Sequence, residues 1–132
     1  PVEFSPWRYT ESPIHRLVIS PTDNNFAVIT DHPNDHESCQ LIVVDRHSGQ
    51  ELIRAESRFI RNLCFDSRDR YIAATMFAGL VVFDLQERRE VLTVGWQELD
   101  YESTMAMGFS FTSDFITMQA YSVFGFDMQS SR

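Results

Sequence analysis

The stretch LIVVD at residues 41–45 decides the fold, because it recurs twice along the chain. Its counterparts are LVVFD at residues 80–84 and VFGFD at residues 123–127. Each is a short apolar run that ends on an aspartate, which is typical of a buried β-strand that leads into a turn. The three aspartates are spaced 39 and 43 residues apart, so the pattern indicates an internal repeat.

A strand, a polar turn and a second strand precede each of these runs, at residues 17–29, 63–74 and 107–118. Such a pattern predicts a β-hairpin. In the first two copies a turn and a fourth strand follow, at residues 50–53 and 89–92. A period near 40–45 residues with four strands per unit is the signature of a β-propeller blade.

The segment Val43–Leu52 resembles the third strand, turn and fourth strand of the WD40-like family, with Val44 in place of the tryptophan of the Trp-Asp pair. Phe83 and Phe126 hold this place in the later copies, and Leu17–Pro21 resembles the first strand with its Ser-Pro turn. No Gly-His pair precedes a first strand, so the polar network that this pair supports is not expected. The resemblance covers nearly the whole chain and implies propeller blades.

We therefore predict an all-β fold in which residues 1–132 form a single β-propeller segment of about three four-stranded antiparallel blades. The blades are expected over residues 13–54, 59–95 and 104–128, with residues 1–12 as a candidate closing strand. Almost no helix is expected, because no segment holds a 3.6-residue apolar period. Val44, Phe83 and Phe126 are predicted core positions. Propellers close with four to eight blades, so we expect completion by oligomerisation or by further blades.

Composition narrows the classes of partner. Nineteen acidic and eleven basic residues give a net charge of −8, whereas nucleic acids and anionic membranes require a basic face. All basic residues are arginine. As the explanation for the absence of lysine, coding bias is favoured over avoidance of lysine modification.

Cys39 and Cys64 are too few for a disulfide framework, which favours a reducing compartment and a cytoplasmic location. No apolar run approaches the roughly 20 residues that span a bilayer, and no signal segment opens the chain.

The stretch DHPNDHESC at residues 31–39 lies between the second and third strands of the first repeat. His32, His36 and Cys39 offer the nitrogen and sulfur ligands that zinc prefers. A second pair of ligands is missing, so we predict a solvated hairpin loop without a metal. Because such loops project from a blade, we assign the loop three candidate partner contacts: His32, Asp35 and His36.

A second candidate epitope is WQELDYE at residues 96–102, between the second and third repeats. It combines two large aromatic side chains with three acids, and aromatic residues are enriched at interaction hot spots. The alternative is a solvated linker with one buried aromatic ring. We assign Trp96 and Tyr101 as candidate contacts, with a basic peptide as the partner.

The sequence offers no recognisable catalytic set. It has no Gly-x-Ser-x-Gly nucleophile elbow, and five glycines provide no phosphate-binding loop. We therefore expect no enzyme activity, no catalytic residue and no cofactor. The predicted function is a non-catalytic protein–protein interaction scaffold, whose partners are other proteins, a second copy of the chain or further blades. Two alternatives stay open: a propeller segment of a larger enzyme or sensor, and a small ligand-binding β-barrel.

Overall fold

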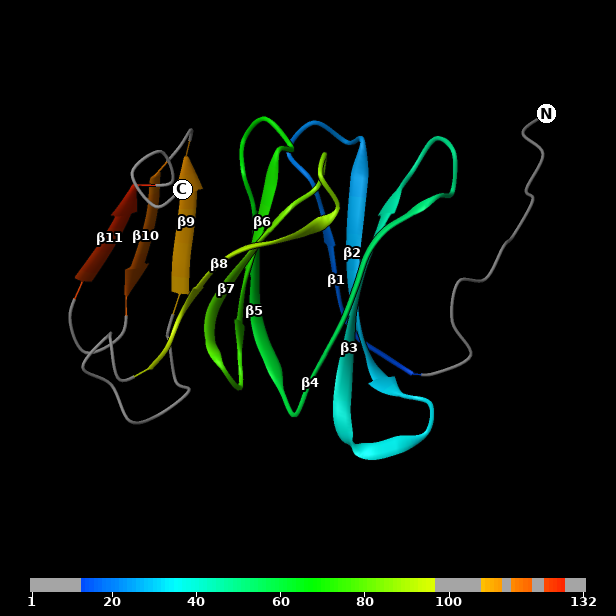
Figure 1. Ribbon diagram of the computed structural model, residues 1–132. Coiled ribbons are helices and arrows are strands. Elements are labelled where there is room, and N and C mark those ends of the chain that lie inside the picture. Colours follow the sequence, from blue (N-terminus) through cyan, green and yellow to red (C-terminus); the bar gives the residue numbers. More distant parts are fainter. Residues whose placement is uncertain (1–12, 97–107, 113–114, 120–122, 128–132) are drawn as a thin grey trace.

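The computed structural model describes residues 13–96, 108–112, 115–119 and 123–127, and these residues form three antiparallel sheets (Figure 1). The first sheet contains, in spatial order, β1 Ile14–Ile19, β2 Asn25–His32, β3 Asp35–Asp45 and β4 Glu51–Ser57. The second contains β5 Ile60–Phe65, β6 Tyr71–Met76, β7 Gly79–Asp84 and β8 Arg89–Val94. The third contains β9 Gly108–Thr112, β10 Phe115–Gln119 and β11 Val123–Asp127. The predicted all-β architecture is confirmed.

The sheets lie side by side as layers, with the second sheet between the first and the third (Figure 1). Each strand pairs with its sequence neighbour, so every sheet is a simple meander. Because the three described sheets are separate, they do not close into a barrel, and the barrel alternative is wrong for the described residues. Among the described residues there is no helix that could cross a bilayer.

The repeat extends to the irregularities of the first two sheets. The pairing between the third and fourth strands shifts register at Val43/Val44 in the first sheet and at Val82/Phe83 in the second. The first and second strands also show a shift in both sheets, at Ile14/Arg16 and at Ile60/Leu63. Such bulges increase the local twist of a sheet. The two sheets are therefore copies of one twisted unit.

The main hydrophobic core lies between the first and second sheets. The first sheet contributes side chains of β2, β3 and β4 to this core, and the second contributes side chains of β5, β6 and β7. Its buried members are Ala27, Ile29, Leu41, Val43, Ile53, Ile60, Leu63, Phe65, Ile72, Ala74, Met76, Val81, Phe83 and Leu85. Val44 is 0% exposed and Phe83 is 6% exposed, so both predicted core positions are confirmed. The side chain of Phe126 lies outside the described residues.

In the first two sheets, the aspartate that ends the third strand stabilises the following turn. Asp45 Oδ1 accepts hydrogen bonds from the N–H groups of His47 at 2.8 Å and Ser48 at 3.1 Å. Asp84 Oδ1 accepts equivalent bonds from the N–H groups of Gln86 at 2.9 Å and Glu87 at 3.0 Å. Both contacts match the turn role that was predicted for these residues.

The expected loop at residues 31–39 is instead an extended hairpin. β2 continues to His32 and β3 begins at Asp35, so only Pro33 and Asn34 connect them. β3 stays extended because it is paired on both sides as far as Cys39, with Asp31 of β2 and Ser57 of β4. Two-sided pairing outweighs the polar, proline-containing composition that predicted a loop.

The corresponding β6–β7 connection is a tight turn that requires glycine. Gly79 has a φ of 137°, and a Cβ at this position would lie 2.0 Å from the backbone oxygen of Val94. A side chain would therefore collide with β8. The turn fixes the exposed residues Phe77 and Ala78 at the end of the second sheet.

Candidate functional site

Four turns meet at one end of the first two sheets and form what we call the turn face. They comprise residues 20–24 and 66–70, which join first to second strands, and residues 46–50 and 85–88, which join third to fourth strands. They meet because alternate strand connections emerge at the same end of an antiparallel sheet (Figure 1). Between the two sheets this face contains a pocket of about 470 Å³.

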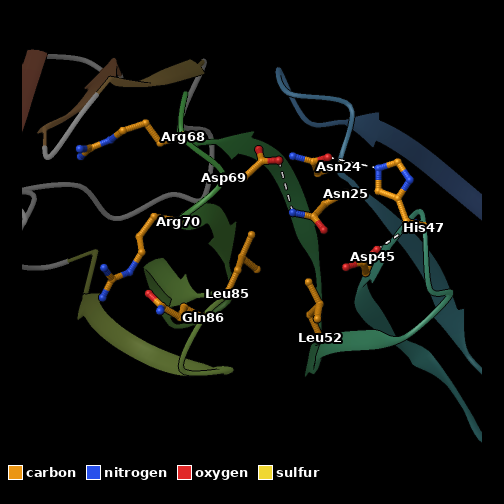
Figure 2. A pocket seen from close by; sticks show the side chains of 10 residues that line it. All are labelled: Asn24, Asn25, Asp45, His47, Leu52, Arg68, Asp69, Arg70, Leu85 and Gln86. Atoms are coloured by element: carbon orange, nitrogen blue, oxygen red, sulfur yellow. Dashed lines mark hydrogen bonds between the residues drawn. The ribbon is translucent and has the colours of Figure 1, made fainter.

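The pocket has an apolar side and a polar rim, as Figure 2 shows. Leu52 of β4 and Leu85, which follows β7, supply the apolar contacts, and Leu85 is only 5% exposed. The other residues that line it come from the turns and the strand ends: Asn24, Asn25, Asp45, His47, Arg68, Asp69, Arg70 and Gln86. A pocket of this composition fits a partner side chain that carries both apolar and polar groups.

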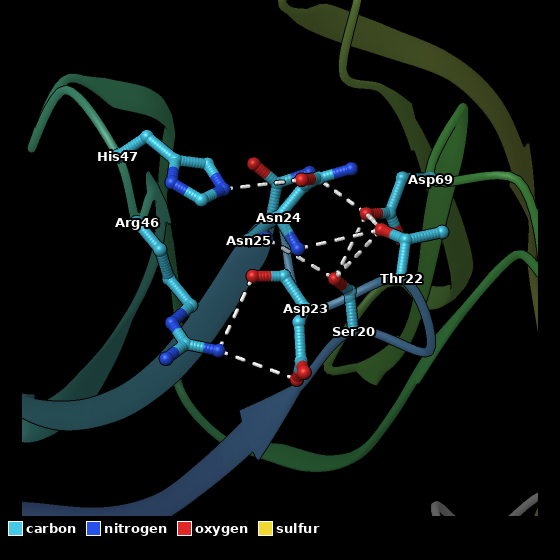
Figure 3. A network of polar contacts seen from close by, with 8 residues as sticks. All are labelled: Ser20, Thr22, Asp23, Asn24, Asn25, Arg46, His47 and Asp69. Carbon is cyan, nitrogen blue, oxygen red and sulfur yellow. Dashed lines mark hydrogen bonds and ion pairs between the residues drawn. The ribbon is translucent and has the colours of Figure 1, made fainter.

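Asp69 connects the two sheets at the wall of the pocket (Figure 3). Its Oδ2 accepts hydrogen bonds from the Ser20 hydroxyl at 2.8 Å, from the Thr22 hydroxyl and from Asn25 Nδ2 at 3.4 Å. All three donors belong to the first sheet or its turn, whereas Asp69 belongs to the second. The other oxygen, Oδ1, is enclosed and has no hydrogen-bond partner in the described part of the chain. This network holds the pocket walls in a fixed relation.

Asp23 occupies the equivalent position in the first sheet but has a different partner. Both residues adopt the left-handed conformation, with φ of 66° for Asp23 and 57° for Asp69. Both N–H groups donate at 3.0 Å to the carbonyl three residues earlier, that of Ser20 or Asp66. The Asp23 carboxylate, however, pairs with Arg46 at 3.2 Å within the same sheet. Asp69 is the one of this pair that bridges to the neighbouring sheet.

An ion pair between a half-buried arginine and a buried carboxylate lies beside the pocket in the second sheet. Arg70 Nη2 is 3.1 Å from Asp84 Oδ2, and the Asp84 side chain is 1% exposed. Burial opposes ionisation of Asp84, but hydrogen bonds from Arg70 and from the N–H groups of Glu87 and Gln86 hold the pKa of its carboxyl below the usual value. The carboxylate therefore stays charged at neutral pH and orients Arg70.

His47 and Asn24 form the outer rim of the pocket on the first sheet. His47 Nε2 lies 3.2 Å from Asn24 Oδ1. Below them, hydrogen bonds from the N–H groups of Ser48 and His47 lower the pKa of the Asp45 carboxyl. Both rim side chains are exposed on the turn face, where a partner protein can contact them.

The predicted contacts His32, Asp35 and His36 all lie on the β2–β3 hairpin, at the opposite end of the sheet from the turn face (Figure 1). His32 Nε2 is 2.8 Å from Glu56 Oε1 of β4. Asp35 accepts hydrogen bonds from the Glu37 N–H and the Ser38 hydroxyl, in that order the main causes of its lowered pKa. His36 is exposed. Across the described residues, no group of three potential ligands gathers to hold a metal ion.

Trp96 packs against the end of the second sheet. Its Nε1 donates to the carbonyl oxygens of Met76 and Phe77, both at 3.2 Å, and the residue is partly buried. Tyr101 lies outside the described residues. The structure thus places Trp96 near the β6–β7 turn and separates it from the pocket residues.

Sequence reasoning missed the pocket. None of the residues that line it was assigned a binding role, although two aligned positions carried a usable signal. Asp23 and Asp69 stand at the same place in two aligned turns, and aspartate tolerates the left-handed conformation that tight turns require. The repeated aspartate indicates the turn. The hydrogen bond between Asp69 and Ser20, however, depends on how the two sheets stack.

Comparisons with known proteins address the fold. No family model and no curated protein matches the sequence. Among solved structures, the β-propeller domain of the Trilobed protease from Pyrococcus furiosus matches with a TM-score of 0.63 and 15% identity, over 81% of this chain and 34% of that chain. Its described architecture is an open velcro topology.

Two further structures agree with this result. The RRP9 WD40 repeats match with a TM-score of 0.66 and 14% identity, over 94% of this chain and 38% of that chain. The β-propeller domain of Myceliophteria thermophila Cps50 (Swd1) matches with a TM-score of 0.57 and 12% identity, over 80% and 34%. The chain thus spans about a third of the length of these structures. These structural similarities confirm the propeller-blade fold that the resemblance of the third strands to the WD40-like family implies.

Proposed function

We propose that this chain, which has the fold of a WD40-like β-propeller segment, is a non-catalytic scaffold that binds other proteins at its turn face. Propellers present many short turns on rigid sheets, which suits them to protein recognition. The observation that carries the proposal is the inter-sheet pocket, whose polar rim and apolar side are fixed by the Asp69 network. A protein partner inserts one side chain there and contacts His47 and Asn24 around it.

The proposal also includes partners that complete the ring: a second copy of the chain or further blades. Ile14, Leu17 and Ile19 of β1 are 55%, 58% and 51% exposed. Leu17 pairs with Val28 and Ile19 with Phe26, so these side chains lie on the face of the first sheet away from the second. Exposed apolar residues along a strand favour coverage by another sheet.

Two parts of the proposal rest on the sequence alone. Reaction chemistry is not proposed because the sequence has no recognisable nucleophile or cofactor motif. The alternative, a propeller segment of a larger enzyme or sensor, is compatible with the same pocket. A cytoplasmic location is proposed because two cysteines are too few for a disulfide framework, which favours a reducing compartment. Fluorescent tagging of the protein in its own cells checks the location.

A pocket-filling substitution tests the proposed function. Gln86→Trp places a large ring at the rim and keeps the N–H that Asp84 binds. The matched control is Glu87→Trp, one residue further along the same turn, because Glu87 is exposed and does not line the pocket. Partner proteins captured by the wild-type chain are purified. The affinity of each partner is then measured for the wild-type chain, for Gln86→Trp and for Glu87→Trp.

We expect the affinity for a true partner to fall at least about tenfold in Gln86→Trp and to stay within about twofold in Glu87→Trp. Equal affinities of both variants would show that the partner does not use the pocket. Failure of the wild-type chain to bind any protein would overturn the scaffold itself.

A further inference from the structure

A cluster of arginine and phenylalanine side chains lies at the end of the sheets opposite the turn face. It is formed by the β4–β5 connection, the β6–β7 turn and the strands β1 and β5, and we call it the arginine–phenylalanine cluster. Its members are Arg16, Arg58, Phe59, Arg61 and Phe77. Figure 1 shows that both connections emerge at the end away from the β1–β2 and β5–β6 turns.

The two rings form the centre of the cluster. The centroids of Phe59 and Phe77 are 5.6 Å apart, with an interplanar angle of 74°. Arg58 Cζ lies 5.4 Å from the centroid of Phe77, and Arg61 Cζ lies 5.3 Å from that of Phe59. These distances are typical of cation–π contacts. Arg16 Nη1 joins the cluster by donating to the Arg61 carbonyl at 3.0 Å.

Hydrogen bonds hold the backbone of Phe77 in place. The N–H of Phe77 donates to Ser57 Oγ at 2.9 Å, and its carbonyl accepts from Trp96 Nε1 at 3.2 Å. Gly79 closes the same turn where no side chain fits. Phe77 is nevertheless 52% exposed. A rigidly held, half-exposed aromatic ring loses little conformational entropy when a partner covers it.

The charge of the cluster is not neutralised within the described residues. Arg46, Arg54, Arg70 and Arg89 each form an ion pair with a carboxylate. In contrast, the three cluster arginines are exposed, and in the part of the chain that the structure describes none of them pairs with an acid. Three such cations on one surface are notable in a chain whose net charge is −8. The surface therefore complements an anionic partner.

We propose that the arginine–phenylalanine cluster binds an acidic, apolar-containing peptide segment of a partner protein. Carboxylates of the segment pair with Arg16, Arg58 and Arg61, and an apolar side chain covers Phe77. A peptide is favoured over a nucleic acid because the overall charge of −8 repels a long polyanion, whereas a few local carboxylates face only the cluster. This surface is separate from the pocket, so the inference does not depend on the proposed use of the turn face.

Fluorescence anisotropy with a synthetic probe tests the inference. The probe is a short labelled peptide in which glutamates alternate with leucine and phenylalanine, and its control has every glutamate replaced by glutamine. Binding is compared for the wild-type chain, the double variant Arg58→Ala/Arg61→Ala and the single variant Phe77→Ser. The matched control is Arg88→Ala/Arg89→Ala, which removes the same charge from the β7–β8 turn and the start of β8.

We expect the acidic peptide to bind the wild-type chain and the Arg88→Ala/Arg89→Ala variant alike. The cluster double variant and Phe77→Ser should each bind at least about tenfold more weakly, and about 0.5 M salt should weaken binding to the wild-type chain. A circular dichroism spectrum identical to that of the wild-type chain would exclude misfolding of a variant. If the cluster double variant misfolds, binding by Phe77→Ser and binding of the glutamine peptide decide the question.

Three results would overturn the inference: no saturable binding of the acidic peptide, equal weakening by the two double variants, or tighter binding of a single-stranded oligonucleotide of similar length. The first result leaves the proposed function standing if Gln86→Trp still impairs binding of a captured partner at the pocket. Conversely, failure of the pocket test leaves a positive peptide result unaffected.

Discussion

Removal of the Asp69 carboxylate should destabilise the protein more than removal of the Asp23 carboxylate, although the two residues occupy the same turn position. Asp69 Oδ2 accepts three side-chain hydrogen bonds from the first sheet, and two of the donor residues, Ser20 and Asn25, are 3% and 7% exposed. Asp23 instead forms an exposed ion pair with Arg46, with side-chain exposures of 79% and 43%. The comparison therefore isolates the contact between the sheets.

The magnitudes follow from the surroundings of each carboxylate. A hydrogen bond to a charged group contributes about 1.5–3 kcal/mol, and the partial exposure of this network favours the lower end. Asp69→Ala loses all three contacts, which share one carboxylate oxygen and are therefore not additive, and should cost about 2–4 kcal/mol. An exposed ion pair contributes about 0–1 kcal/mol, so Asp23→Ala should cost little beyond the strain of alanine at positive φ. Because both variants carry that strain, it cancels in the comparison.

Urea unfolding of the two variants at one protein concentration measures the difference, with Trp fluorescence and circular dichroism as independent probes. We expect Asp69→Ala to be less stable than Asp23→Ala by about 1–4 kcal/mol. A double variant with Ser20→Ala should be less than additive, because one hydrogen bond is lost in both single changes. Equal stabilities of Asp69→Ala and Asp23→Ala would refute the conclusion that the Asp69 network connects the sheets.

Three further predictions concern the core, a turn and the acid limit of stability. Phe83→Ala should cost about 3–5 kcal/mol, because the ring is buried between the sheets; an unchanged melting temperature would mean that the repeat register is wrong. Gly79→Ala should lower the yield of folded protein, since its Cβ would collide with the backbone oxygen of Val94; unchanged thermal unfolding would contradict the observed turn. The folded-state pKa of Asp84 is lowered, so its stabilising contribution is present above the unfolded pKa of about 3.9 and is lost as the pH falls through the folded value. Acid titration of Asp84→Asn should therefore show a smaller loss of stability below about pH 4 than the wild-type chain, and superimposable titrations would argue against this role.

Local patterns predicted most of the fold because each strand and turn depends on a few neighbouring residues. The run at residues 80–84 became a strand followed by an aspartate-stabilised turn, as its composition indicates. The stretch at residues 31–39 was wrongly predicted as a loop. Its extended conformation depends on pairing of β3 with β4, which the composition of the stretch itself does not reveal.

The candidate sites were harder to predict because they combine residues from different sheets. Asp69 and Ser20 are 49 residues apart in sequence, and their hydrogen bond exists only because the sheets stack with their first turns aligned. Phe59 lies in the β4–β5 connection and Phe77 in the β6–β7 turn, and their rings likewise come into contact only in the folded chain. Periodicity identifies which side chains are buried within a sheet, but it carries no information on which surface residues meet between sheets.

Sedimentation velocity of the purified chain tests most directly whether these sheets are blades of a ring that other blades complete. The exposed apolar side chains of β1 should prevent the chain from persisting alone. We therefore expect a dimer or larger assembly, or a chain that becomes soluble only with its completing blades. A sharp monomeric species that melts cooperatively at low micromolar concentration would contradict the propeller segment as described.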